Sequence, residues 1–195
     1  MPGPWLIAGL GNPGPKYDRT RHNAGFWFIE RLAERANAPL KPEKKLKGCA
    51  VRGTVAGEPA VLLAPDTFMN ESGQALRAAI DFYRIEPDRV LVAYDDLDLP
   101  PGTVRIKRGG GHGGHNGLRS AFRHLGTQDF WRLRIGIGHP GLADRVTPWV
   151  LSRPGRDDER AIVDAIERAL DVIGDVLADR EGEAMKVLHA RDPAR

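Results

Sequence analysis

Five polar residues that could act on a carbonyl group stand near the predicted strand ends: Asn12, His22, Asn70, Asp95 and Asn116. An imidazole can be neutral at working pH, so His22 could take a proton from water. A carboxylate at its other ring nitrogen would fix the tautomer and stabilise the cation, and Asp95 follows directly on an apolar run. Asparagine amides can donate to an oxyanion or hold the attacking water, which suits Asn12 and Asn70.

Other kinds of catalytic centre are less well supported by the sequence. Cys49 lies in a predicted strand without an activating neighbour, and Ser72 lacks the first glycine of a nucleophile elbow. A metal site at Asp95, Asp96 and Asp98 is not favoured, because alternate strand residues point apart and no histidine is spaced as a partner ligand. Attack of water on an acyl carbon, with a histidine as base, is the simplest chemistry left.

A dinucleotide site is a second possibility, because Gly9, Gly11 and Gly14 match the glycine spacing of that fingerprint. The fingerprint needs a helix that opens at its third glycine, so that pyrophosphate lies on the helix N-terminus. Here the helical pattern begins only near His22. The acidic residue expected ~20 positions on would fall inside that helix. The sequence therefore argues against a nucleotide-dependent enzyme.

Apolar runs and helical periodicities alternate along the chain. Strands are predicted at 5–10, 48–55, 60–64, 90–94, 104–108 and 132–138, and helices at about 23–36, 74–83, 118–125 and 157–178. Asn70 is predicted to cap the second helix, and 41–47 to be a basic connection. This order favours an α/β fold, with a mixed, mainly parallel sheet flanked by helices on both faces. Its strand ends could bring the polar residues into one crevice.

The bulk composition predicts one intracellular domain spanning residues 1–195. A single cysteine excludes an internal disulfide and fits a reducing cytoplasm. No apolar run approaches the ~20 residues of a membrane-spanning helix. No Lys or Arg precedes the first apolar run, so no secretory signal is expected.

Basic charge is concentrated in residues 101–140, which carry seven Lys or Arg residues against one acid. Such a surplus indicates a face that binds a polyanion, although a solvated basic surface remains an alternative. Arg105 and Lys107 are two apart on a predicted strand, so their side chains point to the same face. Two adjacent cations suit a phosphate.

Six motifs carry a resemblance to a known family. They are Gly9-Leu-Gly-Asn-Pro-Gly14, Thr20-Arg-His-Asn-Ala-Gly25, Thr67-Phe-Met-Asn-x-Ser-Gly73, Asp95-x-Leu-Asp-Leu-Pro-Pro-Gly102, Gly109-Gly-Gly-His-Gly-Gly-His-Asn-Gly117 and Arg132-Leu-Arg-Ile-Gly-Ile-Gly-His-Pro140. Each motif alone is a modest signal, but six in this order, from about Trp5 to Leu188, closely resemble the bacterial peptidyl-tRNA hydrolases.

The resemblance implies a monomeric cytoplasmic enzyme that hydrolyses the ester between a peptide and the 3′-terminal ribose of tRNA, which recycles the tRNA. His22 would be the catalytic base, Asp95 its partner and Asn12 a further catalytic residue. The substrate groove would be formed by Tyr17, Phe68, Met69, Asn70, His115 and Asn116. No metal or organic cofactor is expected.

The same resemblance implies that Arg105 and Lys107 grip the 5′ phosphate of tRNA and that Arg134 lies near the RNA-binding side. A double-stranded acceptor stem is read mainly through its backbone and shape. A non-catalytic RNA-binding relative is the alternative from another class. The intact set of Asn12, His22, Asn70 and Asp95 favours the enzyme. The C-terminal helix could serve packing or act as a mobile lid.

Overall fold

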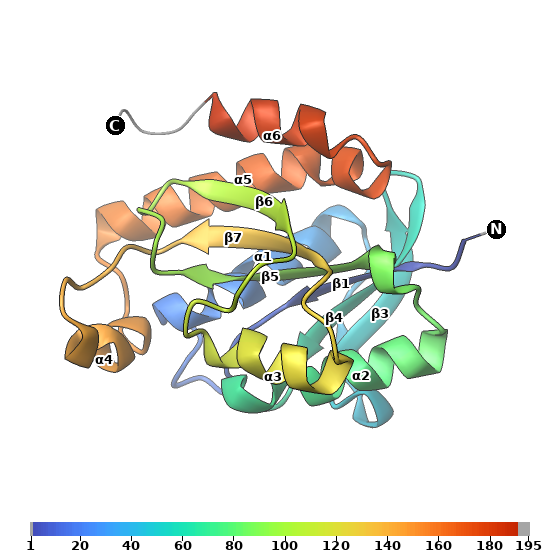
Figure 1. The fold of residues 1–195 in the computed structure, drawn as a ribbon, viewed down its shortest axis with the longest axis horizontal. Helices are drawn as coiled ribbons and strands as arrows, with labels where there is room; N and C mark the ends of the chain where they lie inside the picture. The colour runs from blue at the N-terminus through green and yellow to red at the C-terminus, as the bar shows by residue number, and fades with distance from the viewer. Residues whose placement is uncertain (1, 191–195) are drawn as a thin grey trace.

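The computed structural model describes residues 2–190, and its centre is a mixed β-sheet (Figure 1). Within the described residues the strands are β1 (Trp5–Gly9), β2 (Lys41–Glu43), β3 (Gly48–Val55), β4 (Glu58–Pro65), β5 (Val90–Asp96), β6 (Val104–Arg108) and β7 (Trp131–Gly136). Their order across the sheet is β2-β3-β4-β1-β5-β7-β6. The central strands β4, β1, β5 and β7 are parallel, whereas β3 and β6 run in the opposite direction.

Helices cover both faces of this sheet, as the sequence predicts. They are α1 (Ala24–Arg35), α2 (Ser72–Tyr83), α3 (Asn116–Leu125), α4 (Val146–Val150), α5 (Arg156–Leu177) and α6 (Glu181–His189). One face carries α2 and α3, and the other carries α1, α5 and α6 (Figure 1). The short α4 lies beyond the end of β7 (Figure 1). The predicted fold class is therefore confirmed.

Each face of the sheet has its own hydrophobic core. Along β1, Trp5 and Ile7 pack against the α1, α5 and α6 side, whereas Leu6 and Ala8 pack against the α2 and α3 side. All four are at most 1% exposed. A strand that is buried on both faces must be apolar at every position, which explains the continuous apolar runs in the sequence. Each large apolar side chain buried in this way contributes about 1.5–3 kcal/mol.

The N-terminal glycines let α1 approach the sheet closely. A Cβ atom on Gly9 would collide with the carbonyl of Gly25, and a Cβ on Gly25 would collide with the backbone of Leu10. Gly11 lies equally close to the ring of Phe26. Because α1 begins only at Ala24, no helix opens at Gly14. Of the glycines in the spacing that resembles a dinucleotide fingerprint, Gly9 and Gly11 therefore serve close packing, whereas Gly14 has a positive φ of 103° in a turn.

Two local predictions are wrong, and a third is incomplete. The 41–47 connection contains the edge strand β2 and a 3₁₀ turn, η2 (Lys44–Leu46). The residue before α2 is Glu71, and Asn70 lies in a preceding 3₁₀ turn, η3 (Met69–Glu71), so Asn70 does not cap the helix. The helix predicted at 157–178 is confirmed as α5, but the short α4 before it and α6 after it were not predicted.

Two further predictions concern the chain as a whole. Within residues 2–190, no helix combines the length and apolar character needed to cross a bilayer. A single domain over residues 1–195 stays a prediction, because residues 1 and 191–195 lie outside the described part.

Candidate active site

A cavity of about 380 Å³ opens where several strands of the sheet end. β1 pairs with β4 on one side and with β5 on the other, so the chain reverses direction across the sheet at β1. Such a switch point leaves a crevice at the carboxyl ends of the strands. The predicted site residues that line the cavity are Asn12, His22, Phe68, Met69, Asn70, Asp95, Lys107, His115, Asn116 and Arg134. The sequence-based grouping of these residues thus matches the cavity.

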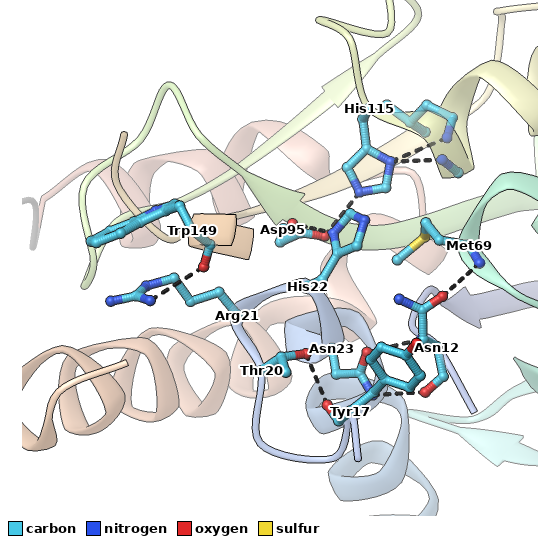
Figure 2. Close-up of polar contacts among 12 residues, drawn as sticks. Asn12, Tyr17, Thr20, Arg21, His22, Asn23, Met69, Asp95, His115 and Trp149 are labelled. Atoms are coloured by element: carbon cyan, nitrogen blue, oxygen red, sulfur yellow. Dashed lines mark hydrogen bonds and ion pairs between the residues drawn. The ribbon is translucent and has the colours of Figure 1, made fainter. Parts of the chain in front are cut away.

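His22 and Asp95 are in direct contact, as predicted. His22 lies in a 3₁₀ turn, η1 (Arg21–Asn23), that leads into α1, and Asp95 lies near the end of β5. The Nδ1 atom of His22 is 2.7 Å from Oδ2 of Asp95 (Figure 2). Both residues are buried, at 8% and 2% exposure. The other ring nitrogen of His22, Nε2, is therefore the one that can accept a proton from a molecule in the cavity.

His115 also contacts Asp95, and this contact was not predicted. Its Nε2 atom is 2.8 Å from Oδ1 of Asp95 (Figure 2). Its Nδ1 atom accepts hydrogen bonds from the backbone N–H groups of Gly117 and Leu118, at 3.1 and 3.2 Å, and so caps α3. Because a backbone N–H can only donate, Nδ1 carries no proton and Nε2–H must donate to Asp95. We call His22, Asp95 and His115 the histidine–aspartate cluster.

The cluster shifts the acidity of two of its members. Burial alone would raise the pKa of the Asp95 carboxyl, but its electrostatic interactions and hydrogen bonds with His22 and His115 hold that pKa well below its usual range. Burial alone would lower the pKa of His22, but the Asp95 carboxylate outweighs burial and raises this pKa above its ordinary value of 6.5. Asp95 is therefore ionised, and His22 is made a stronger base than a free imidazole.

Asn12 presents its amide nitrogen to the cavity. The backbone N–H of Met69 donates to Oδ1 of Asn12 at 2.7 Å, so the oxygen must face Met69 and the NH₂ group must face away (Figure 2). Asn23 fixes the Asn12 backbone: its Oδ1 accepts from the Asn12 N–H at 2.8 Å, and its Nδ2 donates to the Asn12 carbonyl at 3.0 Å. Sequence reasoning assigned no role to Asn23, although it directly follows His22 in a motif.

The cavity mouth combines apolar and amide groups. Phe68 is 56% exposed and packs edge-to-face on Tyr17, with ring centroids 6.3 Å apart. Tyr17 does not line the cavity itself, so the predicted groove residue supports Phe68 from outside. Asn70 and Asn116 are exposed residues of the lining. Such a mouth can hold an apolar group and hydrogen-bond to a polar one.

A group of cations stands beside the cavity, and we call Arg105, Lys107 and Arg134 the basic rim. Arg105 lies opposite Arg134 in the ladder between β6 and β7, so these side chains share one sheet face. Lys107 and Arg134 line the cavity, but Arg105 does not. Burial and the neighbouring arginine charges lower the pKa of Lys107. Arg134 donates through Nε to Asp96 at 2.8 Å, which holds its guanidinium in place.

Not all of the basic charge in residues 101–140 reaches the surface. Arg132 is fully buried, and its guanidinium donates to the carbonyls of Gly110, Gly111 and Gln128. Arg132 therefore holds the glycine-rich loop in place and does not contribute to a polyanion-binding face. This partly corrects the interpretation of the local charge surplus.

The histidine–aspartate cluster also has the composition of a metal site. One ligand atom from each of its three residues lies within 4.8 Å of the others. The prediction that no histidine is placed as a partner ligand of Asp95 is therefore wrong. However, both carboxylate oxygens already contact a histidine nitrogen, at 2.7 and 2.8 Å. An ion would have to replace both hydrogen bonds, so the geometry fits proton transfer better than metal binding.

Comparison with known proteins gives a consistent result. The family model described as peptidyl-tRNA hydrolase matches residues 6–195. A peptidyl-tRNA hydrolase of Acidithiobacillus ferrooxidans is 54% identical over 186 residues, covering 95% of this chain and 98% of that protein. One of Coxiella burnetii is 52% identical over 185 residues, covering 95% and 97%. The crystal structure of peptidyl-tRNA hydrolase from Acinetobacter baumannii has a TM-score of 0.94 and 45% identity, covering 100% of this chain and 98% of that one.

Proposed function

The chain belongs to the peptidyl-tRNA hydrolase family, which hydrolyses peptidyl-tRNA and recycles the tRNA, and we propose that His22 is its general base. The observation that carries this proposal is the 2.7 Å contact between His22 Nδ1 and the buried Asp95 carboxylate. It leaves Nε2 of His22 directed at the cavity, with a raised pKa. A base of this kind contributes roughly 10²- to 10⁴-fold to a hydrolysis rate.

In the proposed reaction, the oxygen of a water molecule forms a bond with the acyl carbon of the ester while His22 Nε2 takes a proton from that water. Asp95 stabilises the resulting imidazolium. The intermediate then breaks the bond between the acyl carbon and the 3′ oxygen of the ribose. His22 returns its proton to this oxygen. The products are a peptide carboxylic acid and a tRNA with a free 3′ hydroxyl group.

Asn12 is the proposed donor to the oxyanion of the intermediate. Its NH₂ group faces away from Met69, and its backbone is fixed by Asn23. A donor that is held before the reaction stabilises developing charge without having to reorganise. Asn70 and Asn116 would bind the peptide and the terminal adenosine, because their amides line the cavity mouth.

The basic rim is proposed to bind the acceptor stem and 5′ phosphate of the tRNA. Two of its cations line the cavity, so a phosphate bound there would lie beside the reacting ester. Contacts to phosphate are independent of base sequence, which suits an enzyme that acts on many tRNAs. A monomer in the cytoplasm, where ribosomes produce peptidyl-tRNA, is part of the same proposal.

The test is release of an N-blocked amino acid from its tRNA ester by the wild type, His22→Ala and His139→Ala. His139 is an exposed histidine outside the cavity, so it controls for loss of an imidazole. We expect His22→Ala to lower kcat by roughly 10²- to 10⁴-fold, with unchanged tRNA binding, and His139→Ala to act like the wild type. A His22→Ala variant with near-normal kcat would show that His22 is not the base.

The same assay separates proton transfer from metal chemistry. Each reaction is run with and without EDTA, and then with added Zn²⁺. The proposal predicts equal rates under all three conditions. Loss of activity in EDTA, restored by Zn²⁺, would instead assign the histidine–aspartate cluster to a metal. A folded wild type that binds tRNA but releases no amino acid would favour the RNA-binding alternative.

A further inference from the structure

Arg21, the residue directly before His22, is a buried arginine. It is only 5% exposed and does not line the cavity. A buried arginine needs hydrogen-bond acceptors for its guanidinium, because an unpaired buried charge is strongly destabilising. The hydrogen-bond partners of this side chain therefore indicate which segments of the protein Arg21 connects.

Those partners all lie at the C-terminal end of α4. Nη1 of Arg21 donates to Oγ of Ser152 at 2.6 Å and to the carbonyls of Trp149, Ser152 and Arg153 at 3.3, 3.4 and 3.4 Å. The guanidinium stacks on the Trp149 ring, 3.4 Å from its centroid (Figure 2). The Arg21 backbone N–H also donates to the Ser152 carbonyl at 3.0 Å. Arg21 thus donates to carbonyl groups at and just beyond the C-terminal end of α4, where backbone carbonyls lack helical partners or share them.

The segment that Arg21 holds forms one wall of the cavity. Val146, Thr147, Val150 and Leu151 line the cavity, but Trp149 does not. Instead, Nε1 of Trp149 donates to the carbonyl of Gly138 at 2.9 Å, just beyond β7. The wall is therefore tied to the end of β7 through Trp149 and to the His22 turn through Arg21.

Within the described residues, the His22 turn has no side-chain capping bonds of its own. η1 has three residues, and short 3₁₀ turns have poor hydrogen-bond geometry. Thr20, at its N-cap, makes no side-chain capping bond, and Asn23, at the N-cap of α1, makes none either. The side chain of Asn23 is used to bind Asn12. His22 is thus flanked by two residues that tie the turn to its surroundings, Asn23 on one side and Arg21 on the other.

We propose that Arg21 is a positioning residue that joins the His22 turn to the cavity wall 146–153. It fixes the imidazole of His22 relative to this wall. The inference rests on the proposed role of His22. A substrate seated against the wall would then contact a surface that also fixes the base. Because a displacement of about 1 Å can lower a rate roughly 10²-fold, such a joint could determine kcat without any contact between Arg21 and substrate.

The experiment compares Arg21→Gln, Arg21→Lys, Trp149→Leu and the control Arg168→Gln in hydrolysis of an N-blocked aminoacyl-tRNA. Arg168 also ties a helix to a loop, since its Nη2 donates to the carbonyl of Gly102, which precedes the edge strand β6. We expect Arg21→Gln to lower kcat roughly 10- to 100-fold with KM nearly unchanged. Arg21→Lys should restore part of the loss, and Arg168→Gln should keep the wild-type kcat.

Two further readouts separate positioning from general stability. The acid limb of the pH profile of kcat/KM should move to lower pH in Arg21→Gln. The reason is that Asp95 raises the pKa of His22 less when the imidazole is displaced from the carboxylate. The combination of Arg21→Gln with Trp149→Leu should lower kcat by less than the product of the two single effects, because both changes break the contact between these two side chains. The loss that remains additive is expected from the Trp149 bond to Gly138, which only Trp149→Leu removes. If Arg21→Gln does not fold, Trp149→Leu alone carries both the kcat and the pH measurement.

Three outcomes would overturn the inference. They are an unchanged kcat in the folded variants, a loss of activity equal to that of Arg168→Gln, and an unshifted acid limb. If His22→Ala were fully active, the proposed base would fail independently of Arg21. If His22 proves essential and the Arg21 variants remain normal, only the positioning role fails.

Discussion

The histidine–aspartate cluster and the basic rim lie in one cavity but are built in different ways. In the cluster, every partner of Asp95 is fixed, at 2.7 and 2.8 Å, and the carboxylate is 2% exposed. In the rim, the cations are partly exposed and spread over two strands. A proton transfer depends on the placement of a few atoms, whereas attraction to phosphate depends mainly on the summed charge. The two regions should therefore respond differently to substitution.

The largest effect is expected from Asp95→Asn, which removes the carboxylate that raises the pKa of the proposed base His22. An amide can also present its NH₂ group to His22 and favour the wrong tautomer. We expect kcat to fall roughly 10²- to 10⁴-fold, while tRNA binding, measured by filter retention, stays near wild type. The neighbouring Asp96→Asn removes a carboxylate from Arg134 and should change tRNA binding more than kcat. Equal losses of kcat in both variants would remove the distinction between the two regions.

A smaller effect is expected at His115, which both contacts Asp95 and caps α3. His115→Ala should lose both interactions, with about 1 kcal/mol of stability lost with the cap. His115→Asn can restore the cap, because asparagine caps helices well, but its side chain is too short to replace the Asp95 contact. Thermal unfolding should thus recover in His115→Asn while kcat remains reduced. If both the unfolding temperature and kcat recovered in His115→Asn, His115 would act only through the stability of α3.

The smallest effect on catalysis is expected from Arg105→Ala combined with Lys107→Ala. Loss of two phosphate contacts should flatten the slope of log binding constant against log salt by up to about 2, with kcat at saturation nearly unchanged. Lys44→Ala with Lys45→Ala is the matched control, since these exposed lysines belong to η2, next to the edge strand β2 on the opposite side of the sheet from β6. An equal change in both pairs would show that net charge, rather than the rim, attracts the tRNA.

Much of the fold could be predicted because its signals are local. The continuous apolar run at 90–94 corresponds to β5, which is buried on both faces, and the periodicity at 23–36 corresponds to α1. The edge strand β2 was missed, since its three residues, Lys41–Glu43, have no alternating pattern. Its pairing depends on the neighbouring β3, which local sequence does not describe.

The site was predicted in its composition but not in its full connectivity. The pairing of His22 with Asp95 followed from the order of strand ends and from the chemistry that each residue supports. The contact between Asp95 and His115 depends on how α3 is placed at the sheet edge, so residue spacing could not reveal it. The same is true of Arg21, whose partners lie more than 120 positions away.

The pH dependence of kcat/KM for the wild-type enzyme tests the central claim most directly. This profile reports the pKa of the essential base in the free enzyme, and the base must be neutral to act. Because Asp95 raises the pKa of His22, activity should be lost on acidification with a midpoint above 6.5. A midpoint at or below 6.5, or no acid limb at all, would contradict a His22 base strengthened by Asp95.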